Sequence, residues 1–301
     1  MRYNLMFPMR AIKHWNRWSE GASLGDIALL VEEVGFDAFS MSEHPYPDKE
    51  WLANGGHHAF DPFVSLSFAA AATTRLRLMT YLLVSGYRSP FLTAKGAASL
   101  DLLSGGRFTL GTGAGYLKSE FDALGADFDR RGALLDEAIS VWKSVWAGVD
   151  HDGPEFGVSG HLALPPPLTD GGPPIWIGGN GAAAQRRVVD VADGWMPMAA
   201  SGEMATITRA RPLEDVETLA DWIATVNKRR ADTGRLAADV AFVPFEADLL
   251  ASGDCAAFCA AVQPRLDAYG AAGVTWITVE PASRSFTDFS TDVRVLAAQL
   301  R

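Results

Sequence analysis

An acidic residue and a histidine stand side by side at Glu43 and His44, within residues 40–45. Histidine is the side chain best suited to exchange a proton near neutral pH, because its unperturbed pKa is about 6.5. A neighbouring carboxylate can orient the imidazole, so the pair is typical of general acid–base chemistry. A surface loop with two adjacent polar residues is the alternative interpretation.

Two glycine-rich segments have the composition of ligand-binding turns. Gly111, Gly113 and Gly115 alternate with other residues, which allows a ligand to approach the backbone closely. Residues 178–182 (Gly-Gly-Asn-Gly-Ala) lead from an apolar run into a helical pattern, which exposes backbone N–H groups and a positive helix end to an anion. For both segments, a tight turn that needs glycine only for its backbone angles stays an alternative.

The remaining histidines and the cysteines lack the spacing of a metal site. His57-His58, His151 and His161 have no acidic or cysteine partners at metal-ligand spacing, so no metal is expected. Cys255 and Cys259 are four residues apart, which places them on one face of a helix, as small buried hydrophobic side chains.

Short apolar runs alternate with longer amphipathic ones along the chain, the pattern of βα units that build a parallel sheet. Strands are predicted at residues 3–7, 38–41, 76–83, 107–111, 174–178, 194–196, 239–245 and 274–279. Gly35 and Gly105 at helix ends support these boundaries. At helix starts, Asp61-Pro62 and Ser89-Pro90 each place a capping side chain ahead of a Pro at the first helical position.

Eight βα units in 301 residues suit a closed (β/α)8 TIM barrel of the α/β class. An open doubly wound sheet is disfavoured, because the first strand leads into polar and aromatic residues 9–23 rather than a Gly-x-Gly-x-x-Gly turn. We expect a single barrel domain over residues 1–301, with a small hairpin insertion near 151–169 and a lid near 199–212. Chemistry in such barrels lies at the C-terminal ends of the strands, where Glu43, His44 and both glycine-rich turns fall.

The composition limits the partners of the protein. Lys and Arg number 26 against 36 Asp and Glu, and the net charge of -10 has the wrong sign for neutralising a nucleic-acid backbone. The amino-terminal apolar stretch is too short for a signal peptide or a membrane span. We therefore expect a cytoplasmic protein with no nucleic-acid or membrane partner.

Several short motifs occur in a characteristic order along the chain. They are Gly-Phe-Asp at 35–37 leading to Glu43-His44, Arg-Ser-Pro at 88–90, Leu-Asp-Leu-Leu-Ser-Gly-Gly-Arg-Phe at 100–108, Gly-Thr-Gly-Ala-Gly at 111–115 and Pro-Ile-Trp-Ile-Gly-Gly-Asn at 174–180. With this ordered set the chain resembles the bacterial luciferase-like oxidoreductases over nearly its whole length. The resemblance is closest to the branch that depends on the deazaflavin coenzyme F420.

The resemblance implies a TIM barrel that holds a flavin or deazaflavin at the strand ends and transfers a hydride at C5 of its ring. Glu43 and His44 would both contact the cofactor ring. His44 would also donate or accept the accompanying proton, and Glu43, often Asp in the family, would orient His44 or the cofactor. A non-proline cis peptide is implied at the end of the third strand, between Tyr81 and Leu82, with Val84 beside the ring.

Further cofactor contacts are implied in the glycine-rich turns. Ala114, Gly115 and Ser119 are expected along the cofactor cleft, and Gly179, Asn180, Gly181 and Ala182 at its phosphate. In the bacterial luciferases an Arg that meets the flavin phosphate stands at the position of Ala114, so its absence here favours F420 over FMN.

Two other functions fit the same residues, an FMN-dependent monooxygenase and a non-catalytic flavin-binding protein. The substrate is expected to be a small organic molecule, and Trp15, Trp18, Trp51 and Tyr87 are candidates to wall a bulky apolar one. The resemblance further implies a homodimer built through barrel helices.

Overall fold

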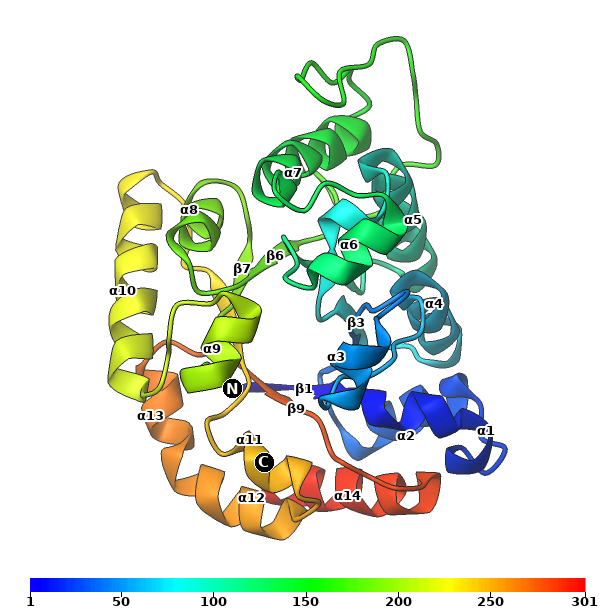
Figure 1. The fold of residues 1–301 in the computed structure, drawn as a ribbon, viewed down its shortest axis with the longest axis vertical. Coiled ribbons are helices and arrows are strands. Elements are labelled where there is room, and N and C mark those ends of the chain that lie inside the picture. Colours follow the sequence, from blue (N-terminus) through cyan, green and yellow to red (C-terminus); the bar gives the residue numbers. More distant parts are fainter. Residues whose placement is uncertain (301) are drawn as a thin grey trace.

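A computed structural model of the chain describes residues 1–300, except for the side chains of residues 203 and 204. The strands run parallel in the order β3-β2-β1-β9-β8-β7-β6-β5-β4, and β3 closes the ring by pairing with β5. Helices surround the strands on the outside (Figure 1). The predicted (β/α)8 TIM barrel is confirmed.

The predicted strands all occur, with bounds that differ by a few residues. They are β1 (Arg2–Met6), β2 (Ala38–Met41), β3 (Arg77–Thr80), β4 (Leu83–Val84), β5 (Phe108–Gly113), β6 (Ile175–Gly178), β7 (Gly194–Met196), β8 (Asp239–Phe242) and β9 (Trp276–Val279). The predicted strand at 76–83 is divided into β3 and β4. Between them the Tyr81-Leu82 peptide bond is cis, as predicted.

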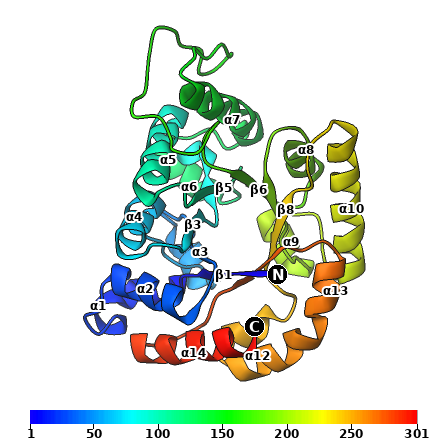
Figure 2. The ribbon, with the colours of Figure 1, turned by 180° about the vertical axis from the view of Figure 1, so that it is seen from behind.

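The helices form an outer layer and a set of short loop helices. The outer layer consists of α2 (Leu24–Val34), α4 (Pro62–Ala72), α5 (Pro90–Ser104), α7 (Arg131–Ala147), α8 (Ala182–Asp190), α10 (Val216–Asp232), α12 (Cys255–Val262), α13 (Leu266–Ala271) and α14 (Phe286–Gln299). The loops carry η1 (Met9–His14), α1 (Trp15–Trp18), α3 (Lys49–Ala53), η2 (Ser85–Tyr87), α6 (Lys118–Leu124), α9 (Gly202–Thr208), α11 (Ala247–Ala251) and η3 (Gln263–Arg265). Helices α3, α6 and α9 lie toward the viewer in Figure 1 and behind the strands in Figure 2, over one end of the barrel.

Helix ends follow the capping chemistry of the sequence. At α2, Ser23 Oγ accepts from the Asp26 N–H (3.1 Å) and the Asp26 carboxylate accepts from the Ser23 N–H (2.8 Å). The helix ends at Gly35, whose φ of 103° is a left-handed conformation that glycine adopts without strain. Asp61 caps α4 as predicted, whereas Ser89, expected to cap α5, makes no capping hydrogen bond.

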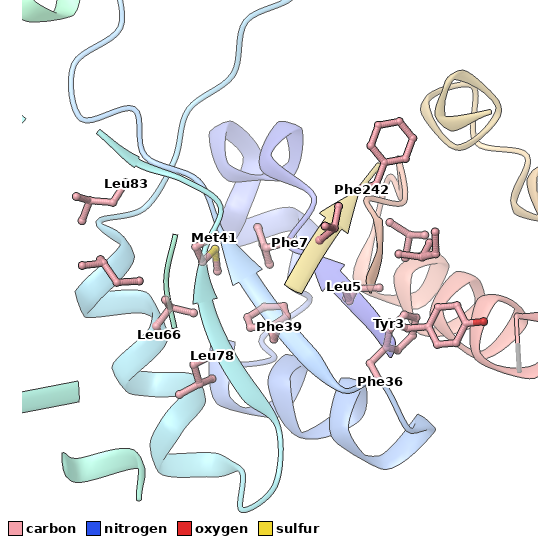
Figure 3. Packing of buried hydrophobic residues seen from close by; sticks show 14 of the residues in the cluster. Tyr3, Leu5, Phe7, Phe36, Phe39, Met41, Leu66, Leu78, Leu83 and Phe242 are labelled. Carbon is pink, nitrogen blue, oxygen red and sulfur yellow. The ribbon is translucent and has the colours of Figure 1, made fainter. Parts of the chain in front are cut away.

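Side chains alternate between the interior of the barrel and the helix layer. On β2, Phe39 and Met41 pack outward with the core beneath the helices (Figure 3). Ser40 points inward and accepts a hydrogen bond from Asn4 Nδ2 of β1 (2.9 Å), which also donates to Thr278 Oγ1 of β9 (3.2 Å). Neighbouring strands therefore contribute a polar layer inside the barrel.

The two expected insertions differ in structure. Residues 151–169 have no regular helix or strand and contain an antiparallel bridge between His151 and Val158. A cavity of about 300 Å³ lies between this segment and the ends of α5 and α7, lined by Phe91, Val145 and Leu162 among others. Residues 199–212 contain the helix α9, and Ala200 pairs with Leu213 beside it.

Cys255 and Cys259 are buried, free thiols on α12, as their spacing predicts. Burial, with a smaller effect of Asp292, raises the pKa of Cys255 to about 12, so this thiol is unreactive at neutral pH. No helix in residues 1–300 is long and apolar enough to cross a membrane. The same residues contain no group of three or more His, Cys, Asp or Glu arranged to hold a metal ion.

Candidate active site

Glu43 and His44 have different partners, although they are adjacent in sequence. Glu43 bonds to residues of β4 and the loop after it, whereas His44 bonds to Glu120 of α6. Successive side chains of a strand point to opposite faces. The alternation of Ser40 inward and Met41 outward continues past the end of β2 and separates the two groups. No hydrogen bond or ion pair joins Glu43 to His44 within the described chain, so the structure does not bring the predicted pair together.

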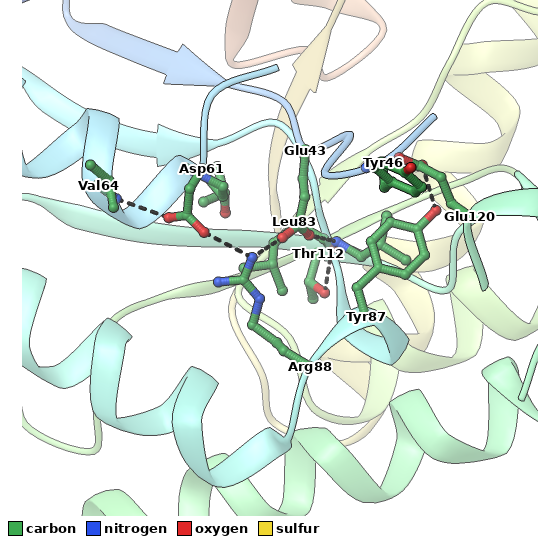
Figure 4. Close-up of polar contacts among 12 residues, drawn as sticks. Glu43, Tyr46, Asp61, Val64, Leu83, Tyr87, Arg88, Thr112 and Glu120 are labelled. Carbon is green, nitrogen blue, oxygen red and sulfur yellow. Dashed lines mark hydrogen bonds and ion pairs between the residues drawn. The ribbon is translucent and has the colours of Figure 1, made fainter. Parts of the chain in front are cut away.

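Glu120 is the carboxylate that orients His44. It is fully buried and accepts a hydrogen bond from His44 Nδ1 (2.9 Å). It also accepts from the Tyr46 N–H (3.0 Å) and the Tyr87 hydroxyl (2.9 Å) (Figure 4). Because the carboxylate accepts from Nδ1, that nitrogen carries the hydrogen, and Nε2 is left to give or take a proton.

Aromatic rings enclose the imidazole of His44. The centroid of the Trp51 ring is 4.5 Å away and that of His57 is 4.9 Å away. His57 Nδ1 lies 3.1 Å from the backbone oxygen of His58, to which it donates. Burial, followed by the nearby imidazole of His44, lowers the pKa of His57 to about 4. His57 is therefore neutral at pH 7 and adds no positive charge beside His44.

Glu43 joins the end of β2 to β4. Its carboxylate accepts from the Val84 N–H (2.7 Å) and from Arg88, which also contacts Asp61 (3.3 Å) (Figure 4). Burial raises the pKa of Glu43 to about 7, against the opposing effect of Arg88. These contacts make Glu43 a residue that positions β4.

The residues on either side of the cis peptide fill the interior of the barrel. Tyr81 and Leu82 pack against the apolar cluster inside the strands, and the Tyr81 hydroxyl lies 3.4 Å from the backbone oxygen of Ala241. A Cβ at Gly113 would be 3.2 Å, and one at Gly178 2.2 Å, from the Leu82 side chain. The glycines at the ends of β5 and β6 therefore leave room for Leu82.

Residues in the loop after β5 pack closely against their neighbours or bond to them. Gly115 has a φ of 82°, and a Cβ there would lie 2.5 Å from the Val84 side chain and 2.9 Å from Phe121. Ala114 is partly buried against the core, and the Ser119 hydroxyl donates to Asp48. Close packing thus explains Gly115, and its predicted contact with a cofactor stays a prediction.

The turn after β6 leads into α8 without a side-chain cap. Asn180 is buried, and its side chain donates to the Met198 (2.7 Å) and Arg211 (2.8 Å) carbonyls and accepts from the Met198 N–H (2.9 Å). Gly181 precedes α8 and provides no side-chain cap, and the space around its Cβ position is open. No side chain therefore caps the first N–H groups of α8.

Two of the aromatic residues expected to wall a substrate lie at this site, and two do not. Trp51 packs on His44, and Tyr87 donates to Glu120. Trp15 and Trp18 instead pack against Phe7 outside the barrel, with ring centroids 6.1 and 5.7 Å from it. Trp18 is buried in the core and Trp15 packs against it partly buried, so both have a packing role, and their contact with a substrate stays a prediction.

Sequence reasoning missed Glu120 and Glu280. Glu120 follows the glycines of residues 111–115 on a loop, where an acidic residue attracts no notice without its partner. Glu280 directly follows β9, and its Oε1 accepts from the Met9 N–H (3.1 Å). Its position directly after the strand predicted at residues 274–279 could have singled it out as a site residue, because chemistry in such barrels lies at the C-terminal ends of the strands.

The structure defines a TIM-barrel protein with a buried histidine–carboxylate contact and an uncapped glycine-containing turn at the C-terminal ends of its strands. The sequence profile of the luciferase-like monooxygenases matches residues 13–257. The chain therefore belongs to the luciferase-like monooxygenase family.

Curated relatives match part of the chain. The F420-dependent glucose-6-phosphate dehydrogenase of Nocardia farcinica is 32% identical over 186 residues, which are 60% of this chain and 54% of the relative. The enzyme of the same name from Mycobacterium avium is 31% identical over 190 residues, again 60% of this chain and 54% of the relative. The chain thus spans about half the length of these relatives.

A solved structure matches the whole barrel. An F420-dependent secondary alcohol dehydrogenase, in complex with an F420-acetone adduct, superposes with a TM-score of 0.72 at 16% identity, over 100% of this chain and 99% of that one. At this identity the likeness concerns the fold.

Proposed function

We propose that this protein is an F420-dependent oxidoreductase that transfers a hydride between the deazaflavin ring and a small organic substrate. The observation that carries the proposal is His44, whose Nδ1 is held by Glu120 at 2.9 Å and whose Nε2 is left to exchange a proton. When a hydride leaves a hydroxyl-bearing carbon, the oxygen must lose its proton, so a base is needed beside it. The F420-dependent relatives support this cofactor over FMN.

The turn after β6 fits the phosphate of this cofactor. Gly181 brings no side chain to the start of α8, and Ala182 and the alanines after it leave the backbone N–H groups uncovered. The positive end of the helix dipole attracts an anion to the same place. Asn180 would hold the turn in shape through its three hydrogen bonds to residues 198 and 211.

The remaining cofactor contacts stay within the same mouth of the barrel. We assign them to Tyr81, Leu82, Val84, Ala114, Gly115 and Ser119. When bound, the deazaflavin supplies a ring carbon that takes up or releases the hydride.

The side chains around His44 would divide the proton chemistry among them. His44 Nε2 removes the proton from a substrate hydroxyl in the oxidative direction and returns it in the reductive one. Glu120 stabilises the positive charge that forms on the imidazole, an effect of about 1.5 to 3 kcal/mol for a hydrogen bond to a charged group. Trp51 covers one side of the imidazole and keeps water from it. Glu43 acts as a positioning residue through Val84.

Titration of the purified protein with F420 and with FMN, followed by fluorescence, tests the proposal. We expect a Kd for F420 in the micromolar range or below and binding of FMN at least about tenfold weaker, a difference of about 1.4 kcal/mol. Equal or tighter FMN binding, with aerobic turnover of reduced FMN, would identify a flavin monooxygenase instead. Binding without turnover of any alcohol or ketone would identify a non-catalytic carrier.

We further propose that the protein is a homodimer in the cytoplasm. Large apolar side chains are exposed on two barrel helices, Val64 and Phe68 on α4 and Leu92 and Leu103 on α5, with exposed fractions from 59 to 80%. A pairing of these helices between two copies would cover them. Analytical ultracentrifugation tests the oligomeric state, and a monomer at micromolar concentration would contradict it.

A further inference from the structure

Two Asn-Gly pairs occur in the sequence, and the structure places them in different surroundings. Asn180-Gly181 lies in the turn after β6, and Asn54-Gly55 follows α3. The side-chain amide of an asparagine can be attacked by the backbone nitrogen of the next residue. Glycine permits this attack best, because it has no side chain to obstruct the approach. The local structure therefore decides which of the two pairs reacts.

The side chain of Asn180 is fixed at both ends of its amide. It is buried, and its Nδ2 donates to the carbonyls of Met198 (2.7 Å) and Arg211 (2.8 Å). Its Oδ1 accepts from the Met198 N–H (2.9 Å). Attack by the Gly181 nitrogen requires the amide to turn away from all of these partners. The hydrogen bonds thus protect this pair.

The side chain of Asn54 has none of these restraints. It is exposed, and it makes no hydrogen bond or ion pair with residues 1–300. Gly55 has a φ of 92°, and no atom lies within 4 Å of its Cβ position. In the described chain its N–H has no hydrogen-bond acceptor, whereas the Asn54 N–H donates to the carbonyls of Glu50 (3.1 Å) and Trp51 (3.2 Å). The backbone beyond Asn54 can therefore rotate and bring the Gly55 nitrogen to the amide.

We propose that Asn54 is a site of spontaneous deamidation. The Gly55 nitrogen attacks Cγ of Asn54, a bond forms between these atoms, and the bond from Cγ to Nδ2 breaks. Ammonia leaves with the proton of the Gly55 N–H, and a cyclic succinimide remains. Water then opens the succinimide at either of its carbonyls, which gives aspartate or isoaspartate. The net reaction consumes water and releases ammonia, with no oxidation or reduction.

The modification changes the surroundings of His44. In isoaspartate the main chain runs through the former side chain, which adds one carbon between residues 54 and 55. Gly56 donates to the Trp51 carbonyl at 3.0 Å, and a Cβ on Gly56 would lie 2.3 Å from the Trp51 ring. Such close packing leaves no room for a longer chain. Trp51 therefore shifts from the imidazole of His44, whose ring centroid is 4.5 Å from its own.

Peptide mapping by mass spectrometry, on the full-length protein incubated at pH 8 and 37 °C, tests the proposal. A sample digested without incubation gives the background. We expect conversion of amide to acid at Asn54 at least about tenfold faster than at Asn180, the equivalent of about 1.4 kcal/mol. Isoaspartyl methyltransferase should label the peptide that contains position 54.

Two variants assign the reaction to this pair. Asn54→Gln should remove both signals, because its longer side chain does not close the same ring. Gly55→Ala should slow the conversion by at least about fivefold, because a Cβ hinders the attack. Equal rates at Asn54 and Asn180, or an Asn54 that keeps its amide, would overturn the proposal.

Turnover measures the consequence at His44, and this part alone rests on the proposed function. F420-dependent turnover should fall in proportion to the fraction of isoaspartate, whereas incubated Asn54→Gln should keep its initial rate. Asn54→Asp adds the charge without the extra carbon and should lose less activity. Deamidation in a protein that shows no F420-dependent turnover when fresh would overturn the proposed function and support the modification. Isoaspartate at position 54 with unchanged turnover would overturn the shift of Trp51.

Discussion

The two sides of the barrel mouth are built from different chemical groups. After β2 and β5, side chains meet: His44 bonds to Glu120 and packs against Trp51. After β6, the turn from Gly179 to Ala182 presents backbone N–H groups, and Gly181 adds no side chain. An imidazole can gain or lose a proton near neutral pH, whereas a backbone amide can only bind. The first side should therefore govern the rate, and the second the affinity for the cofactor.

His44→Ala should have the largest effect on the first side. Loss of a general acid or base lowers turnover by about a hundredfold or more. The Kd for F420 should change less than about twofold, because the proposed role of the imidazole is to move the proton and the proposed phosphate site is the turn after β6. Steady-state kinetics and fluorescence titration measure the two quantities. His161→Ala, at an exposed histidine, is the control, and full turnover of His44→Ala would place the proton donor elsewhere.

Glu120→Gln should have the next largest effect. The substitution keeps the shape of the side chain but removes the negative charge beside His44 Nδ1. We expect kcat to fall about ten- to hundredfold, the equivalent of a hydrogen bond to a charged group. Tyr87→Phe removes one neutral donor from the same carboxylate and should lower kcat less than about tenfold. Equal effects of the two substitutions would show that the charge of Glu120 does not stabilise the imidazolium.

Gly181→Asp tests the second side of the comparison. The Cβ position is open, so the side chain fits, and its negative charge lies at the proposed phosphate position. F420 binding should weaken by about tenfold, or about 1.4 kcal/mol, while the Tm changes little. Gly181→Asn adds nearly the same volume without charge and should bind F420 more tightly than Gly181→Asp. The turn has only a structural role if both variants lose the same affinity for F420. The same conclusion follows if Gly181→Asp weakens the binding of a phosphate-free fragment of the cofactor as much as that of F420.

Glu43→Gln should have the smallest effect on turnover and a measurable one on stability. Because the folded-state pKa of Glu43 is raised to about 7 from 4.5, its contribution to stability is full below pH 4.5 and is lost as the pH rises through 7. The unmodified protein should lose up to about 3 kcal/mol of unfolding free energy from this group over that range, and the variant should lack this decline. Urea denaturation at pH 5, 6 and 7 measures the slope.

Glu32→Gln is the control for this slope. The pKa of Glu32 is lowered by hydrogen bonds from residues 74–76 that outweigh its burial, so its titration lies below pH 4.5. Glu32→Gln should lower stability at each pH without changing the slope between pH 5 and 7. A Glu43→Gln protein with the slope of the unmodified one would show that Glu43 is ionised throughout this range.

Local patterns in the sequence were sufficient for the fold. The periods of apolar residues predicted eight strands, of which the one at 76–83 is divided into β3 and β4, since a parallel strand with both faces buried is a short apolar run between helical segments. Motif order predicted the family and the position of the cis peptide at Tyr81-Leu82. His44 was found because a histidine directly after a strand of a barrel stands at its C-terminal mouth.

The partners of these residues were decided by the tertiary structure alone. His44 meets Glu120, 76 residues away, because the closed ring brings the loops after β2 and β5 to the same mouth. Glu43 meets Val84 and Arg88 because the alternation of side chains directs it away from its neighbour. A sequence determines period and local turn chemistry within a few residues, whereas such contacts depend on the register between strands, which forms only when the barrel closes.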